Sequence, residues 1–163
     1  MLKGIWSTDE LHYGGRHFTA IGQIIKPGPV QRPHPPLWLG GNARVVRDRV
    51  ARWGQGWAPL QGTPTLARTA RTPGIFTVED LEAMLRDVGT RLEANGRSLS
   101  DIDIAAASPG LPRDASAQQR LDAIAHLSEL GVTWTGAPVT QGSVPAALDG
   151  LRQFGEEIAA KTR

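Results

Sequence analysis

The sequence has no cysteine among its 163 residues, and only one tyrosine and three phenylalanines. Without cysteine there is no disulfide, no thiolate nucleophile and no thiolate metal ligand, which leaves core packing as the main source of stability. No stretch approaches the ~18 consecutive apolar residues that a membrane-spanning helix needs, and no basic segment followed by a hydrophobic run opens the chain. We therefore expect a cytoplasmic protein with no membrane partner.

Net charge is also small, but it is unevenly placed. The formal charge is +2; residues 1–76 carry ten basic and three acidic side chains, a net of +7, whereas residues 77–163 have a net charge of −5. A positive half suits an anionic ligand and is equally compatible with a solvated surface. The hydrophobic content of 40% and the charged content of 21% exclude an intrinsically disordered chain that is kept expanded by its net charge.

Two common kinds of site are not indicated. The four histidines are scattered without metal-ligand spacing, so no metal site is expected. The arginine-rich segment 43–53 accompanies no recognised nucleic-acid module, and Asp48 is spaced to pair with Arg44 and Arg52 on one helix. We therefore expect a solvated helix face there and no nucleic-acid partner.

Glycine and proline, 19 and 12 residues, divide the chain into short elements. Residues 1–36 hold several glycine and proline pairs, which predict an irregular lead-in or insertion segment with extended or hairpin parts. Beyond it, short apolar runs alternate with helical spacing, and Asn42 is placed to cap the first helix. We expect strands at 37–39, 56–60, 102–107 and 132–135, a long loop over 61–76, and helices at 43–53, 77–95, 116–130 and 143–158.

The helices are predicted with their caps and inner faces. Thr77, Ser116 and Ser143 stand where a side chain caps the helix that follows. Apolar residues three and four positions apart predict one inner face for each helix. These are Ala43, Val46, Val50 and Trp53 in the first helix, Leu81, Leu85, Val88 and Leu92 in the second, and Val144, Ala147, Leu151, Phe154 and Ile158 in the last.

Four strand–helix units in succession favour a parallel sheet with right-handed crossovers, and hence the α/β class. A complete eight-unit barrel takes about 250 residues. We therefore predict that residues 37–163 form a half-barrel domain, a (β/α)4 half of a TIM barrel with parallel strands and flanking helices.

Residues 27–42 (PGPVQRPHPPLWLGGN) and 51–59 (ARWGQGWAP) together resemble the luciferase-like monooxygenase family of flavin- and deazaflavin-dependent oxidoreductases. Segments 5–6, 15–18 and 130–133 agree with it. The resemblance implies that the chain is the C-terminal half of the family fold, (β/α) units five to eight. Because the early strands of the family supply the residues beside the reactive ring, no catalytic residue can be assigned in this chain.

The same resemblance implies that Gly40 and Gly41 end a strand where the coenzyme ring or its tail lies against the main chain, and that Asn42 begins the next helix. A side chain at either glycine would add bulk where barrel enzymes place ligands, and the helix N-terminus offers N–H groups to an anion. Arg44 lies in the first helical turn, where the helix dipole disfavours a cation. A bound phosphate would offset that conflict, and a side chain extended into water would nearly avoid it.

Two further candidates have a structural explanation as well. Trp57 resembles the aromatic residue of its family segment, although an apolar residue in a strand more often belongs to the core. Ser143 precedes a helix at a place where barrels frequently hold phosphate, although its role as a helix cap alone explains its presence. At Gln55 the family often has an acidic residue, which puts any charge-dependent role of that position in doubt.

The coenzyme expected is F420, with FMN as the alternative. The candidate cofactor-binding residues are Gly40, Gly41, Asn42, Arg44, Trp57 and Ser143.

The chemistry implied is hydride transfer to, or monooxygenation of, a small organic substrate, with this half contributing coenzyme-binding backbone. The alternative is a non-catalytic truncated remnant or an assembly subunit. An open four-stranded sheet has two unpaired edges and an uncovered inner face, so we expect a second copy or a complementary N-terminal half-barrel as partner. In a lone chain, Trp38, Trp57 and Trp134 are expected to be exposed.

Overall fold

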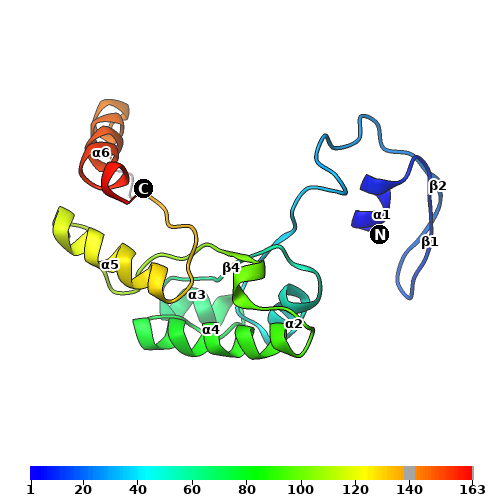
Figure 1. Cartoon of the computed structure of the whole chain (residues 1–163), viewed down its shortest axis with the longest axis horizontal. Helices are drawn as coiled ribbons and strands as arrows, with labels where there is room; N and C mark the ends of the chain where they lie inside the picture. The colour runs from blue at the N-terminus through cyan, green and yellow to red at the C-terminus, as the bar shows by residue number, and fades with distance from the viewer. Residues whose placement is uncertain (138–141, 163) are drawn as a thin grey trace. The chain divides into compact units, whose positions relative to one another are not determined.

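The computed structural model describes residues 1–137 and 142–162. The chain divides into two compact units, Met1–Pro36 and Leu37–Arg163. Figure 1 traces the elements of both units in chain order.

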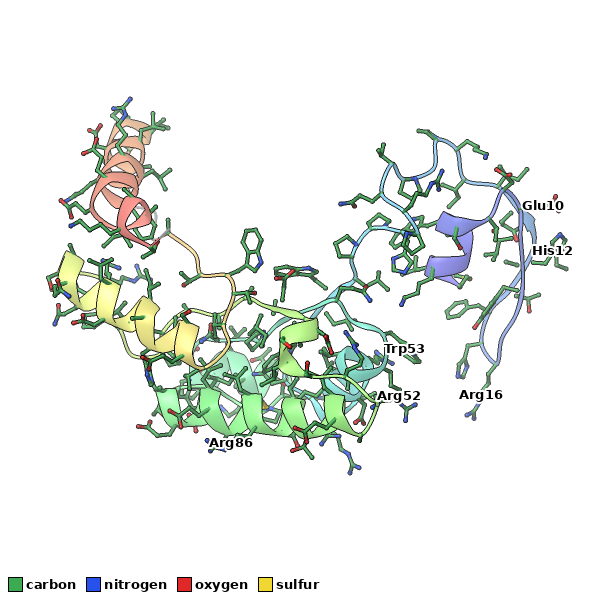
Figure 2. All side chains as sticks on the ribbon, viewed as in Figure 1. Glu10, His12, Arg16, Arg52, Trp53 and Arg86 are labelled. Carbon is green, nitrogen blue, oxygen red and sulfur yellow. The ribbon has the colours of Figure 1, made fainter. Side chains whose placement is uncertain are left out.

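The first unit contains a helix and a hairpin. Helix α1 spans Leu2–Ser7, and strands β1 (Leu11–Gly14) and β2 (Thr19–Gln23) pair in antiparallel fashion. Glu10 and His12, which Figure 2 labels on the hairpin, form a pair with Nε2 and Oε1 2.8 Å apart. The helix was not foreseen from the glycine- and proline-rich sequence.

The second unit is built on a parallel sheet. Strands β3 (Trp38–Gly40), β4 (Gly56–Ala58) and β5 (Asp103–Ile104) lie side by side in that order, and Ala105 forms a parallel bridge with Trp134. Three of the predicted strand segments therefore form one sheet, and the fourth, at 132–135, joins it through this single bridge. β4 and β5 are shorter than the sequence suggested, whereas β3 has the expected three residues, shifted by one.

The two faces of this sheet differ sharply. Leu39, Trp57 and Ile104 stand on the face that packs against helices, and Trp57 is completely buried, so the expectation that it would be exposed is wrong. The opposite face carries Trp38, 39% exposed, and beside it Trp134, 58% exposed, with ring centroids 6.0 Å apart. Neighbouring residues of a strand point to opposite faces of the sheet. The side chain of Trp57 therefore points into the core, and that of Trp38 points to the open face.

Helices follow each strand of the second unit. The loop expected over 61–76 contains the short helix α3, which begins with a proline after the capping residue Thr63. Thr77 and Ser116 form capping boxes and Ser143 caps the last helix, as their spacing predicted. The elements are α2 (Arg44–Trp53), α3 (Pro64–Thr69), α4 (Val78–Glu93), η1 (Leu99–Asp101), α5 (Ala117–Glu129), α6 (Val144–Glu157) and η2 (Ala159–Lys161).

The core lies between the sheet and α2 and α4. One face of α4 is completely or almost completely buried through the residues predicted from their four–three–four spacing: Leu81, Leu85, Val88 and Leu92. They pack with Val50 and Ala51 of α2 and with Trp57 and Ile104 of the sheet. Burying a side chain of this size contributes about 1.5–3 kcal/mol. Trp53, expected on the inner face of α2, is exposed and projects with Arg52 from its end (Figure 2).

Ion pairs join α2 to α4 on their outer side. Arg91 binds Asp87 through Nε, 2.7 Å from Oδ2, and also pairs with Asp48, while Arg47 pairs with Asp87. Asp48 therefore pairs with a residue of the neighbouring helix. Its spacing had suggested instead that it pairs with Arg44 and Arg52 of its own helix. The hydrogen bond from Arg91 lowers the pKa of Asp87, against the opposing effect of partial burial.

The C-terminal end of α2 is closed by Arg97. Its guanidinium donates to the carbonyl oxygens of Val50 (3.2 Å), Ala51 (3.1 Å) and Gly54 (2.7 Å). A cation at the negative end of a helix, bonded to its last carbonyls, stabilises that end. It fixes where α2 stops and β4 begins.

The apolar side of α6 is open. The face predicted to point inward includes Val144, 74% exposed, and Leu151, 41% exposed, and the helix buries none of its own residues. Only Ile158, the residue directly after the helix, is buried as predicted among the members of that face that the structure describes. Among the described residues no helix is long and apolar enough to cross a bilayer. The expected cytoplasmic location stays a prediction.

Candidate functional site

The turn that ends β3 leaves room at its glycines. A Cβ atom on Gly40 would meet only the carbonyl oxygen of Ala58, at 3.8 Å, so the fold itself does not require glycine there. Gly41 has φ +105°, a conformation that strongly favours glycine, and its N–H donates to the same carbonyl over 3.1 Å. The turn is thus held at the carboxyl end of the strand with space beside its backbone.

Asn42 is completely buried directly after these glycines. Its Nδ2 donates to the carbonyl oxygens of Leu60 and Pro73, both at 2.8 Å, and its Oδ1 accepts from the N–H of Leu60 at 2.8 Å. Its own N–H donates to Oγ1 of Thr72 over 3.2 Å. The Asn42 side chain therefore joins three segments of the chain, and the prediction that it caps α2 is wrong: the helix begins after Ala43, with no side-chain cap.

Trp57 supports the same turn from behind. Its Nε1 donates to the carbonyl oxygen of Gly41 over 2.9 Å while its ring is buried in the core. The side chain thus lies on the helix-covered face, and its contact with the proposed site runs through the main chain of Gly41.

A further residue of this edge, Gln61, was missed by sequence reasoning. Its Nε2 donates to the carbonyl oxygen of Ala107 and its Oε1 accepts from the N–H of Ala107, both over 2.8 Å. The partners are 46 positions apart in the chain, so no local pattern could have revealed the pair. The only signal was a glutamine close behind a strand, a position that reaches the neighbouring strand's end in a parallel sheet.

The other two candidate residues lie differently. Arg44 is exposed at the first position of α2, and within residues 1–137 and 142–162 the N–H groups of Arg44 and Val45 have no hydrogen-bond partner. Ser143 accepts from the N–H of Ala146 over 3.3 Å as the cap of α6. No contact between Ser143 and the Gly40–Asn42 turn is seen in the described part of the chain.

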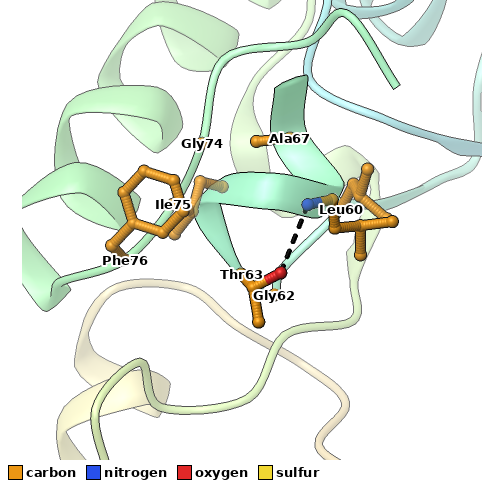
Figure 3. Close-up of a pocket in the computed structure, with 8 residues that line it drawn as sticks. Leu60, Gly62, Thr63, Ala67, Gly74, Ile75 and Phe76 are labelled. Atoms are coloured by element: carbon orange, nitrogen blue, oxygen red, sulfur yellow. Dashed lines mark hydrogen bonds between the residues drawn. The ribbon is translucent and has the colours of Figure 1, made fainter. Parts of the chain in front are cut away.

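A shallow apolar depression adjoins the turn. It has about 150 Å³ of empty space, open solvent included, and Asn42 bonds the main chain at Leu60, on its rim, and at Pro73, next to its lining residue Gly74. Figure 3 draws its lining residues, with the hydrogen bond that Oγ1 of Thr63 accepts from the N–H of Leu66 at the start of α3. The lining residues are Leu60, Gly62, Thr63, Leu66, Ala67, Gly74, Ile75 and Phe76.

The resolved carboxyl pKa shifts belong to residues outside the Gly40–Asn42 turn. Main-chain hydrogen bonds at helix starts lower the pKa of Glu79 and of Asp101, and a hydrogen bond from Lys26 lowers that of Asp9. In the described ranges, no group of three His, Cys, Asp or Glu side chains could hold a metal ion. What the edge offers a ligand is therefore main-chain N–H groups, open glycine backbone and the positive side chain of Arg44.

Residues 1–160 match the sequence model of the luciferase-like monooxygenases. The chain belongs to this family. A curated relative, the FMNH2-dependent dimethylsulfone monooxygenase of Pseudomonas putida, is 31% identical over 98 residues, which are 60% of this chain and 23% of the relative. The enzyme of the same description from Pseudomonas fluorescens is 29% identical over 98 residues, or 60% of this chain and 22% of that protein. The chain thus spans less than a quarter of these relatives.

Solved structures show the same α/β fold. The coenzyme F420 dependent tetrahydromethanopterin reductase of Methanopyrus kandleri superposes with a TM-score of 0.73 at 12% identity, covering 99% of this chain and 61% of that one. The monooxygenase RslO1 of Streptomyces bottropensis gives 0.67 at 15% identity, with 99% and 59% covered. At these identities the likeness is one of fold.

Proposed function

We propose that this chain provides the coenzyme-holding edge of a flavin-type oxidoreductase acting on a small organic substrate. The observation that carries the proposal is the turn at Gly40 and Gly41. It combines open space beside the backbone with main-chain N–H groups at the start of α2 that have no partner among the described residues. Such an arrangement suits a phosphate-bearing ligand at the carboxyl edge of a parallel sheet.

Each residue of the edge has a distinct part in this proposal. Gly40 and Gly41 let the ligand approach the main chain, and the first N–H groups of α2 bind its anionic tail. Arg44 neutralises that tail from the solvent side. Asn42 and Trp57 act through the turn: the side chain of Asn42 ties it to the main chain of Leu60, and the indole of Trp57 binds the carbonyl oxygen of Gly41. When bound, the coenzyme supplies the redox chemistry, and the chain's share is binding and orientation.

Reduced FMN is the first candidate coenzyme. The curated relatives, at 31% and 29% identity, are described as FMNH2-dependent, whereas the F420-dependent neighbour is similar in fold alone, at 12% identity. Sequence similarity therefore favours FMN over F420, the coenzyme preferred from the sequence motifs. F420 stays the second candidate, because main-chain donors at a helix start would accept the phosphate of either coenzyme.

We further propose that the second unit is a half-barrel whose inner face is covered by a second copy or by complementary strands. Trp38 and Trp134 are exposed on that face, and among the described residues β3 has a strand neighbour, β4, on one side alone. Open strand edges and apolar faces of this kind favour association. The alternative is a remnant that retains the fold without binding a coenzyme.

Titration with FMN and with F420, followed by quenching of tryptophan fluorescence, tests the proposal. Trp57 is a suitable reporter because its indole is hydrogen-bonded to Gly41, at the proposed site. We expect saturable quenching by at least one coenzyme. If neither binds, with the chain alone or mixed with the N-terminal half of a family relative, the remnant account holds instead.

A further inference from the structure

Two carboxamides extend the sheet at its carboxyl edge, one after the other. Asn42 pairs with both main-chain groups of Leu60, and the next residue, Gln61, pairs through its side chain with both main-chain groups of Ala107. A primary amide reproduces the donor and acceptor of a peptide group, so each pair replaces a rung of main-chain hydrogen bonding. The chain of contacts runs from the end of β3, across the segment after β4, to the segment after β5.

These rungs lie beyond the regular strands. β4 ends at Ala58 and β5 at Ile104, so Leu60, Gln61 and Ala107 belong to loops that the sheet itself no longer joins. Without the two carboxamides, the hydrogen bonds of the β-ladder would not hold these loops beside the Gly40–Asn42 turn. A loop that begins where a sheet ends is placed by such specific contacts.

Resting on the proposed function, we propose that Gln61 is a positioning residue of the coenzyme-binding edge. Its carboxamide fixes the segment after β4 against Ala107, and this segment in turn holds Asn42 and the turn before it. Gln61 does not touch the coenzyme in this arrangement. It fixes the position of the main chain that contacts the coenzyme.

The chemistry demands glutamine and not glutamate. Gln61 must donate to one main-chain oxygen and accept from one main-chain nitrogen of the same residue, both at 2.8 Å. In Gln61→Glu, the ionised carboxylate lacks the donor and sets an oxygen against the carbonyl of Ala107. The loop must then separate from the end of β5, although size and shape are conserved.

The same strand provides a matched control at its other end. Gln55 accepts from the N–H of Leu37 and donates to the carbonyl oxygen of Trp53, both over 3.0 Å. Gln55→Glu thus makes the same chemical change to a carboxamide with one main-chain donor and one main-chain acceptor. It does so at the amino end of β4, away from the Gly40–Asn42 turn.

The experiment measures FMN affinity and amide hydrogen exchange in both variants. We expect Gln61→Glu to speed exchange at residues 60–62 and 107 by about tenfold, as the loss of one or two hydrogen bonds allows, and to weaken FMN binding by about fivefold or more. Gln55→Glu is expected to leave both within about twofold of wild type at those residues. A structural role alone would lower the melting temperature of both variants and leave FMN affinity of the folded chain unchanged.

Two results would overturn the inference: unchanged exchange at Ala107 in Gln61→Glu, or faster exchange with unchanged FMN affinity. If wild type binds neither FMN nor F420, the proposed function fails. In that case faster exchange in Gln61→Glu supports the loop-holding role of Gln61 and unchanged exchange refutes it, so the two failures are distinguishable.

Discussion

The side chain of Asn42 and the main chain of Leu60 form a two-way hydrogen-bonded pair, with both donor–acceptor distances at 2.8 Å. This pair joins the glycine turn after β3 to the segment after β4. It also determines the start of α2, since Asn42 is engaged with Leu60 and Pro73 and cannot cap the helix.

Truncating Asn42 should destabilise the fold strongly. Asn42→Ala would leave the N–H and carbonyl of Leu60 and the carbonyl of Pro73 without this partner, at a cost of about 2–4 kcal/mol, since each unsatisfied buried group costs about 1–3 kcal/mol. Urea unfolding measures the loss. The control is Asn95→Ala, because Asn95 is exposed and makes a single side-chain bond, to the carbonyl of Arg91, within its own helix end. Equal losses in the two variants would contradict the role assigned to Asn42.

The Asp87–Arg91 pair should make stability depend on pH. Its hydrogen bond from Arg91 lowers the pKa of folded Asp87 below the unfolded value of about 3.9. Its contribution to the free energy of unfolding is therefore present above that unfolded pKa and is lost as pH falls through the lower, folded pKa. Asp87→Asn should be less stable than wild type at pH 6, and the difference should shrink towards pH 2.

Thermal unfolding at a series of pH values follows this difference. Asp149→Asn is the control, because the exposed Asp149–Arg152 pair on α6 should contribute little at any pH. If the gap between wild type and Asp87→Asn stayed constant with pH, the pair with Arg91 would not be the cause.

The open inner face should reveal itself in solution. Trp38 and Trp134 should promote association of the chain and binding of an apolar dye, and replacing both with serine should reduce both effects. Light scattering and dye fluorescence are the measurements. Trp53→Ser provides the comparison, since Trp53 is 53% exposed on α2, outside the sheet's inner face. A monomeric wild type with little dye binding would argue against an uncovered face.

The sequence predicted what depends on local periodicity. The face of α4 through Leu81, Leu85, Val88 and Leu92 and the caps at Thr77 and Ser116 follow from residues three and four positions apart. The joining of three strands in one parallel sheet, with the fourth segment bridged to it at Trp134, follows from their alternation with helices.

What the sequence could not predict depends on distant partners. Asn42 has the right residue type for a cap, but its better partners lie 18 and 31 positions away. Asp48 likewise binds Arg91 across two helices, and Gln61 binds Ala107, 46 positions on. The burial of Trp57 follows from strand register, which a three-residue run does not specify.

The central claim is that the open backbone at Gly40 receives a coenzyme, and one comparison of FMN affinities tests it most directly. Gly40 ends β3 and Gly14 ends β1; a Cβ at Gly40 would meet only the carbonyl oxygen of Ala58, at 3.8 Å, and one at Gly14 nothing within 4 Å, so the Cβ of alanine fits at both. We predict that Gly40→Ala stays folded yet binds FMN at least about tenfold more weakly, a loss near 1.4 kcal/mol, while Gly14→Ala binds like wild type. Saturable binding of equal affinity in all three proteins would contradict the account.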